Sequence, residues 1–119
     1  MAEVLRTPAW QTPLPVPTVD RTDKRWKSDA FWRGDVWPST NYQIASGLAA
    51  YGHADLAADI ADKTIANAIK NGISEHYDSV SGAPLGIRVY YMSSTLVTMM
   101  LDCLSQKRRL KLRGERPAR

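Results

Sequence analysis

The sequence predicts an all-α chain that forms part of a larger helical structure. Two segments, 41–51 and 54–71, carry apolar residues at helical spacing. A third segment, 93–104, is apolar on nearly every side, which is typical of a helix surrounded by other protein. Because two helices and a loop cannot surround the third helix, we expect the chain to be a piece of a larger domain.

The first part of the chain, residues 1–27, predicts an irregular segment, since it holds four of the seven prolines and little periodicity. The first helix is expected from Asn41 to Tyr51, with Ser39 or Thr40 as its N-cap. Gly52 supplies the left-handed residue that ends a helix.

The second helix is expected from about Ala54 to Asn71, followed by Gly72. Its apolar stripe comprises Ala57, Ile60, Ala61, Thr64, Ile65, Ala68 and Ile69. Residues 72–92 are rich in helix breakers and predict a loop. The third helix, which Ser93 and Ser94 would cap, completes a helical part at 28–104.

The net charge of +4 belongs to the end of the chain. Residues 105–119 hold seven basic residues and one acidic residue, so the other 104 residues carry a net charge of −2. A basic tail can hold phosphates, but this one lacks interleaved aromatic residues and a groove-reading motif. We interpret it as a solvated tail and do not expect nucleic acid as a partner.

The composition also argues against several classes of protein. No apolar stretch approaches the roughly 18–20 residues that span a bilayer, and residues 1–6 do not resemble a secretion signal. One cysteine, Cys103, excludes an internal disulfide, and His53 and His76 are too few for a convincing metal site. We therefore expect a cytoplasmic protein without a membrane anchor, a metal or another cofactor.

The segment 31–42, Phe-Trp-Arg-Gly-Asp-Val-Trp-Pro-Ser-Thr-Asn-Tyr, concentrates four aromatic residues, an arginine, a carboxylate and an amide. Flat rings beside directional donors suit a sugar, which has an apolar face and a hydroxyl edge. The same tryptophans would equally serve as core anchors, with Arg33 paired to an acid.

A second unusual segment, 73–82, carries two carboxylates, a histidine and a tyrosine in the expected loop. Glu75 beside aromatic residues could act as a general base on a water molecule. For Asp78 a turn is favoured, in which its side chain bonds the local backbone. His76 is expected on the surface or in packing.

Together these two segments, in this order and with a helical hairpin between them, resemble the C-terminal part of glycosidases built on the (α/α)6 toroid. The nearest are the family 63 processing α-glucosidases, the mannosylglycerate and glucosylglycerate hydrolases, and the trehalases. The resemblance covers roughly residues 28–104. It implies about three of the toroid's twelve helices and a carbohydrate substrate.

The resemblance also implies site residues. Glu75 falls on the general base of an inverting hydrolysis of an α-glycosidic bond. Trp32, Arg33, Trp37 and Asn41 fall on residues that line the sugar site. Tyr77 falls beside the base, where it would orient the base or contact the substrate.

Two departures from the family pattern stand beside these matches. Asp35 replaces the proline that usually follows the glycine, and residues 90–93 replace the usual Phe/Tyr-x-Trp. The general acid of the family is an aspartate upstream of the tryptophan motif, in a stretch that this chain does not contain. An inverting glycosidase needs both carboxyl groups, so we expect the isolated chain to be inactive.

Two interpretations remain open from the sequence. The chain is either a fragment of a glycosidase, with the missing upstream part of the toroid as its partner, or a non-catalytic helical interaction module. The motifs are shared by enzymes acting on α-glucosides, mannosylglycerate, glucosylglycerate and trehalose, so they do not select a substrate.

Overall fold

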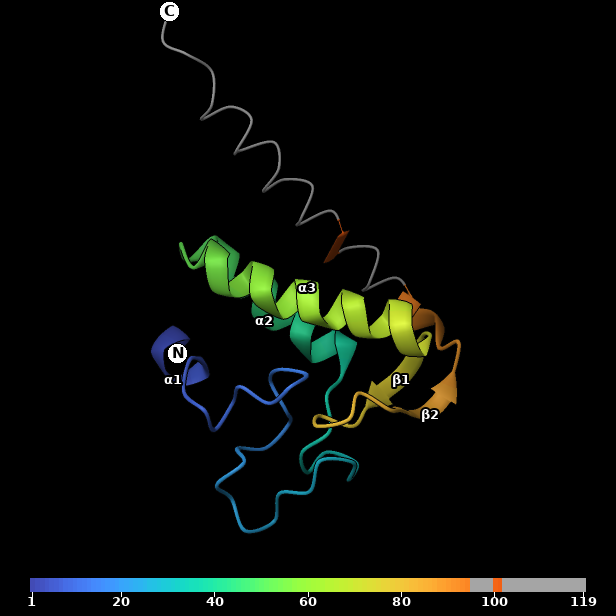
Figure 1. Ribbon diagram of the computed structural model, residues 1–119. Helices are drawn as coiled ribbons and strands as arrows, with labels where there is room; N and C mark the ends of the chain where they lie inside the picture. Colours follow the sequence, from blue (N-terminus) through green and yellow to red (C-terminus); the bar gives the residue numbers. More distant parts are fainter. Residues whose placement is uncertain (95–99, 102–119) are drawn as a thin grey trace, which may run out of the picture.

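A computed structural model of the chain describes residues 1–94, 100 and 101. It contains one long helical hairpin, a small two-stranded sheet and an extended irregular N-terminal segment (Figure 1). The elements are α1 (Ala2–Leu5), α2 (Pro38–Ala50), α3 (Ala54–Asn71), β1 (Ser74–Tyr77) and β2 (Pro84–Arg88). The described part is therefore rich in helix but not purely helical.

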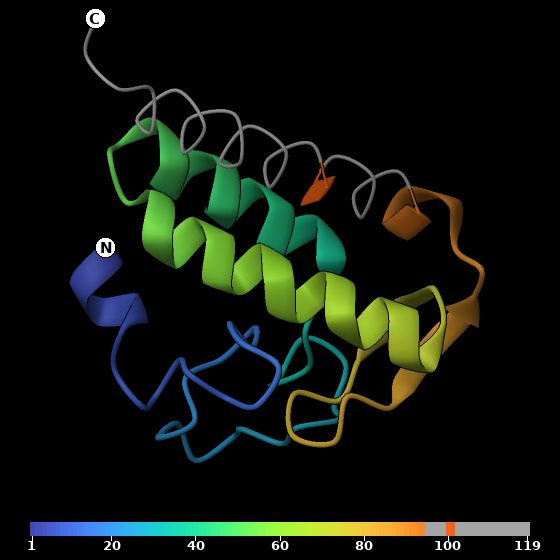
Figure 2. The ribbon, with the colours of Figure 1, turned by 45° about the horizontal axis from the view of Figure 1, so that its top comes forward.

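Helices α2 and α3 lie side by side and antiparallel (Figures 1 and 2). Helix α2 begins three residues earlier than predicted, because Pro38 occupies its first turn and Trp37 is the N-cap. Proline suits this position, where its missing N–H would have no helical partner. The predicted caps Ser39 and Thr40 are thus inside the helix. As predicted, Gly52 follows α2 in the left-handed region, at φ +85°.

Helix α3 has the predicted bounds and buries most of the predicted stripe. Ile60 is fully buried, and Ala57, Ala61, Thr64, Ile65 and Ala68 are buried with it. Ile69, which was assigned to the same stripe, is 80% exposed, so the prediction was wrong for this residue. Ala68, the residue before it, is the last residue of α3 that is buried.

The N-terminal segment is irregular as predicted, except for the short helix α1, which the sequence pattern did not predict. It lies along one side of the helical hairpin (Figure 2). Leu5 and Val16 join Leu48 and Ile60 in a hydrophobic cluster. The proline-rich segment therefore supplies part of the core of the described chain.

The predicted loop at 72–92 is wrong, since it contains the antiparallel pair β1–β2. The pair lies beyond the C-terminal end of α3 (Figure 1). Tyr77 of β1 also forms a bridge with Val36, which lies just before α2. This bridge brings the first unusual sequence segment against the second.

The third predicted helix is only partly described. Residues 91–94, 100 and 101 are helical, and Met100 packs against Ala61 and Ile65 of α3. The rest of this predicted helix and the basic tail, 105–119, lie outside the described residues. Within the part of the chain that the structure describes, no helix has the length and apolarity to cross a bilayer.

Candidate functional site

Four aromatic rings meet where the segment before α2 contacts β1. The indole rings of Trp32 and Trp37 are stacked, with centroids 4.3 Å apart and planes 9° apart. The imidazole of His76 stacks on Trp37 at 4.8 Å. Phe31 packs edge-on against all three rings, at 5.4–5.9 Å. We call Trp32, Trp37, His76 and Phe31 the aromatic stack.

The aromatic stack is anchored by a fully buried carboxylate, Asp35. One of its oxygens accepts a hydrogen bond from the Trp37 indole Nε1 at 2.6 Å, and the other accepts one from the Thr18 hydroxyl at 2.7 Å. His76 Nδ1 lies 2.9 Å from Asp35 Oδ2, although its angle is outside hydrogen-bond geometry. Asp35, the departure from the family pattern, thus orients the stack in this chain.

The outer ring of the stack is presented to solvent by an unusual backbone. Trp32 has φ +55°, a left-handed conformation that bulky residues rarely adopt. Its side chain is 46% exposed, whereas Trp37 is only 7% exposed. Strained backbone of this kind concentrates at binding and catalytic sites. The stack therefore offers one accessible indole face on a buried support.

Arg33 follows Trp32 in the same turn and is exposed. Its backbone N–H donates to the carbonyl of Ala30, and its carbonyl accepts from the N–H of Lys27. The turn fixes the backbone of Arg33 next to the exposed indole. A guanidinium at this place can supply several hydrogen bonds to hydroxyl or carboxylate oxygens.

Glu75 lies on β1, next to His76, and is half-buried. Its carboxylate Oε2 accepts a hydrogen bond of 3.1 Å from the backbone N–H of Ile87. A Cβ atom on Gly86 would overlap this oxygen and would lie 2.9 Å from His76 Nε2. The carboxylate and the His76 ring therefore approach the same point, which places Glu75 at the His76 edge of the stack.

Asn41 and Tyr77, the two other predicted site residues, are fully buried. The Asn41 amide donates to the Pro15 carbonyl at 3.1 Å and to the Thr64 hydroxyl at 2.9 Å. The Tyr77 hydroxyl bridges the end of α3 and the start of β1. These two side chains hold elements together and do not reach the exposed face of the site.

Asp78 forms the turn that the sequence predicted. Its Oδ1 accepts hydrogen bonds from the backbone N–H groups of Val80, at 2.7 Å, and Ser81, at 3.0 Å. Burial acts to raise the pKa of this carboxyl, but these amides and the Ser28 hydroxyl outweigh it and leave the pKa below its ordinary value. Asp78 therefore stabilises the hairpin loop in its ionised form.

Three residues near the aromatic stack have roles that the sequence pattern did not predict. Asp35 anchors the stack, His76 is one of its rings, and Gly86 lies beside Glu75. His76 was expected on the surface or in packing, and its 6% exposure assigns it to packing. The sequence contains both His76 and Asp35, but they come together only because the bridge between Val36 and Tyr77 joins their two segments.

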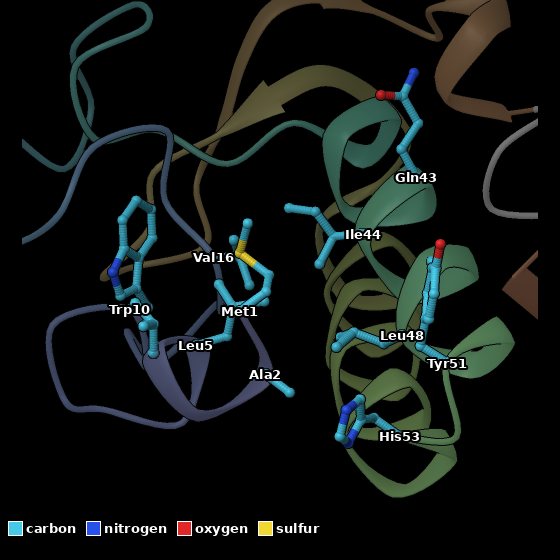
Figure 3. A pocket seen from close by; sticks show the side chains of 12 residues that line it. Met1, Ala2, Leu5, Trp10, Val16, Gln43, Ile44, Leu48, Tyr51 and His53 are labelled. Carbon is cyan, nitrogen blue, oxygen red and sulfur yellow. The ribbon is translucent and has the colours of Figure 1, made fainter.

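A separate cavity of about 800 Å³ lies between α1 and α2. In Figure 3, Ile44 and Leu48 face Met1, Leu5 and Val16 across it. Its walls are largely apolar, and none of the predicted site residues lines it. It is therefore distinct from the aromatic stack.

Among residues 1–94, 100 and 101, no group of three or more His, Cys, Asp or Glu side chains is placed to hold an ion.

Comparison with known proteins gives a consistent result. Residues 1–93 match the family model described as the mannosylglycerate hydrolase MGH1-like glycoside hydrolase domain. The mannosylglycerate hydrolase of Thermus thermophilus is 33% identical over 81 residues, which is 68% of this chain and 20% of that relative. Alpha-glucosidase 2 of Arabidopsis thaliana is 29% identical over 86 residues, 60% of this chain and 11% of that relative.

Solved structures agree with the sequence matches. The family 63 mannosylglycerate hydrolase from Thermus thermophilus in complex with glucose has a TM-score of 0.75 and 28% identity, covering 85% of this chain and 26% of that one. Its complex with Tris and D-glycerate gives 0.67 and 33%, covering 69% and 20%. The chain thus spans about a fifth to a quarter of these structures.

Proposed function

The chain belongs to the mannosylglycerate hydrolase MGH1-like glycoside hydrolase family, and from this premise we propose that it carries one side of a glycosidase active site. The reaction is the inverting hydrolysis of an α-glycosidic bond in a small glycoside. Because relatives named mannosylglycerate hydrolase and alpha-glucosidase share the same segment, the sugar is a mannosyl or glucosyl unit. The segment is part of an (α/α)6 toroid.

Glu75 is the general base. The observation that carries this assignment is the position of its carboxylate at the edge of the aromatic stack, held by the Ile87 amide at 3.1 Å. A half-buried carboxylate with one oxygen bonded to the backbone keeps its other oxygen available for a water molecule. Hydrolysis with inversion needs this water between the base and the anomeric carbon.

Trp32 and Arg33 bind the sugar, and Trp37 supports them. The exposed indole of Trp32 offers a flat apolar face to the C–H groups of a pyranose ring. Arg33 supplies donors for the hydroxyls or for the glycerate carboxylate. Asn41 and Tyr77 do not contact the sugar but stabilise the site, since their buried side chains join the segments that carry it.

The general acid comes from the part of the domain that this chain lacks. Inverting enzymes place it about 6.5–9.5 Å from the base, with water between them. The partner of this chain is therefore the complementary upstream part of the domain, on the same polypeptide or on another. Since general acid catalysis contributes about 10²–10⁴-fold, the chain alone shows negligible turnover.

Sugar binding is tested by NMR on the labelled chain, which has four tryptophans. Glucose, D-glycerate and mannosylglycerate are added in turn, and the four indole N–H signals are followed. We expect Trp32 and Trp37 to shift, while Trp10 and Trp26 stay in place. Shifts at Trp10 alone would move binding to the apolar cavity, and no shift at any indole would favour the non-catalytic interaction module.

The base is tested after the chain is combined with the Thermus thermophilus relative from which the matching segment has been deleted. Restored hydrolysis of mannosylglycerate is expected to disappear with Glu75→Gln. Glu3→Gln is the matched control, because Glu3 lies exposed on α1. Turnover that survives Glu75→Gln excludes Glu75 as the base.

A further inference from the structure

The sheet contains an irregularity opposite Glu75. Ser74 pairs with Arg88 and His76 pairs with Leu85, so β2 has one more residue than β1 between these pairs. This is a β-bulge, and the two β2 residues within it are Gly86 and Ile87. Gly86 has φ +71°, the left-handed conformation that glycine adopts readily in such bulges.

The bulge gives one backbone N–H of β2 a side-chain partner on β1. The N–H of Ile87 is directed to the Glu75 carboxylate, at 3.1 Å. Neighbouring residues on a regular strand point to opposite faces, yet the side chains of Glu75 and His76 both approach Gly86. A Cβ atom at position 86 would overlap Glu75 Oε2 and lie 2.8 Å from His76 Cδ2. Both side chains thus occupy the space that the glycine leaves open.

The position of His76 is itself fixed from the other side. Its ring stacks on Trp37 at 4.8 Å, and its Nδ1 lies 2.9 Å from the buried Asp35. The ring cannot retreat from a new atom at position 86 without breaking this packing. Of the two neighbours, the half-buried Glu75 side chain is the one free to move.

We propose that Gly86 is a positioning residue for Glu75. Its left-handed backbone directs the Ile87 amide to the carboxylate, and its missing side chain lets that carboxylate lie beside the aromatic stack. The inference rests on the proposed function only in that Glu75 is the base. The geometric part, that Gly86 decides where the carboxylate lies, stands without it.

The test follows the Ile87 amide proton of the full chain by NMR as the pH is lowered. A change in the charge of the Glu75 carboxylate alters the chemical shift of this amide, because the two groups are hydrogen-bonded at 3.1 Å. We expect an acid inflection at Ile87 that Glu75→Gln removes. Gly86→Ala should remove the same inflection, because the added methyl displaces the carboxylate from the amide.

Gly52→Ala is the matched control. Gly52 also has a positive φ, +85°, but a Cβ atom there meets no atom within 4 Å. It carries the same kind of backbone strain without the contact, and it should retain the acid inflection at Ile87. Gly86→Asn adds a second arm, since asparagine tolerates the left-handed region and still adds a Cβ atom; it should also lose the inflection.

Three outcomes overturn the proposal: no acid inflection at Ile87 in the unmodified chain, an inflection that survives Glu75→Gln, or one that survives either Gly86 variant. If Gly86→Ala does not fold, Gly86→Asn and the Glu75→Gln comparison still decide. Failure here leaves the indole shifts with sugar and the loss of turnover in Glu75→Gln unaffected. The two proposals therefore fail separately.

Discussion

The phenol of Tyr77 joins the end of α3 to the start of the strand that carries Glu75. Its hydroxyl donates to the carbonyl of Gly72 at 2.8 Å and accepts from the N–H of Ser74 at 3.0 Å. Tyr77 and Ser74 are both fully buried. Tyr77→Phe keeps the ring in the core and deletes only this bridge.

The expected loss of stability in Tyr77→Phe follows from the two hydrogen-bond partners of the hydroxyl, the Gly72 carbonyl and the Ser74 N–H. A buried hydrogen bond contributes about 1 kcal/mol net, and a buried donor left without a partner costs about 1–3 kcal/mol. The Ser74 N–H is closed to water, whereas the half-buried Gly72 can be hydrated in part. We therefore expect Tyr77→Phe to lower the free energy of unfolding by about 2 kcal/mol.

Urea unfolding followed by tryptophan fluorescence measures this change. Tyr51→Phe is the control, because Tyr51 is 84% exposed and should change stability by less than about 0.5 kcal/mol. If the two variants lose equal stability, the bridge contributes nothing and the reasoning from burial is refuted.

The same phenol predicts a response to alkali. Burial raises the pKa of Tyr77 above its ordinary value of 10.0, although the Ser74 N–H and Arg88 act in the opposite direction. The folded state thus prefers the neutral phenol, and its contribution is complete below pH 10 and declines as the pH rises further. Tyr77→Phe should remove this part of the alkaline decline in a urea series; an unchanged decline would assign it to other groups.

Three further changes probe the scaffold of the site. Asp35→Asn replaces the anchor of the aromatic stack and should cost about 1.5–3 kcal/mol in urea unfolding, since hydrogen bonds to charged groups are the stronger ones; a neutral result would mean that the buried carboxylate is not needed. Ile60→Ala should cost about 2–5 kcal/mol from the fully buried core, and Ile69→Ala, at an 80% exposed site, far less. Because the pKa of Asp78 is lowered on folding, the ionised carboxyl contributes to the free energy of unfolding above about pH 4, and this contribution is lost as the pH falls. Asp78→Asn should therefore flatten the decline in stability at acid pH. An equally steep decline in the variant would exclude this carboxyl as its source.

Helix α3 shows what the local sequence pattern can predict about the fold. Its bounds follow from the apolar spacing and from the glycine that ends it, and both depend only on neighbouring residues. Ile69 shows the limit of the pattern, because its exposure depends on where the partner elements stop.

The sheet could not be found in the same way. The residues of β1 do not alternate between buried and exposed, and β2 begins with a proline and contains the bulge at Gly86. Without a period of two, a strand has no local signature. The pairing is visible only once the two segments are aligned in space.

In the candidate site, too, the sequence predicted some features and only the tertiary contacts showed the others. The resemblance assigned Trp32, Trp37 and Asn41 to the sugar site and Glu75 to the base, and it placed Tyr77 beside the base, where it would orient the base or contact the substrate. The structure shows that the side chains of Asn41 and Tyr77 are fully buried, and this burial depends on contacts with Pro15 and with the end of α3.

The sequence by itself determined α3 and the irregular character of most of the N-terminal segment, because these rest on residues close together along the chain, and two of its motifs carried the resemblance to the family. The tertiary structure decided that His76 stacks on Trp37 beside Asp35 and that the irregularity in β2 brings the Ile87 N–H to the Glu75 carboxylate. The physical reason is that the register between distant segments selects which side chains meet, and no single segment encodes that register.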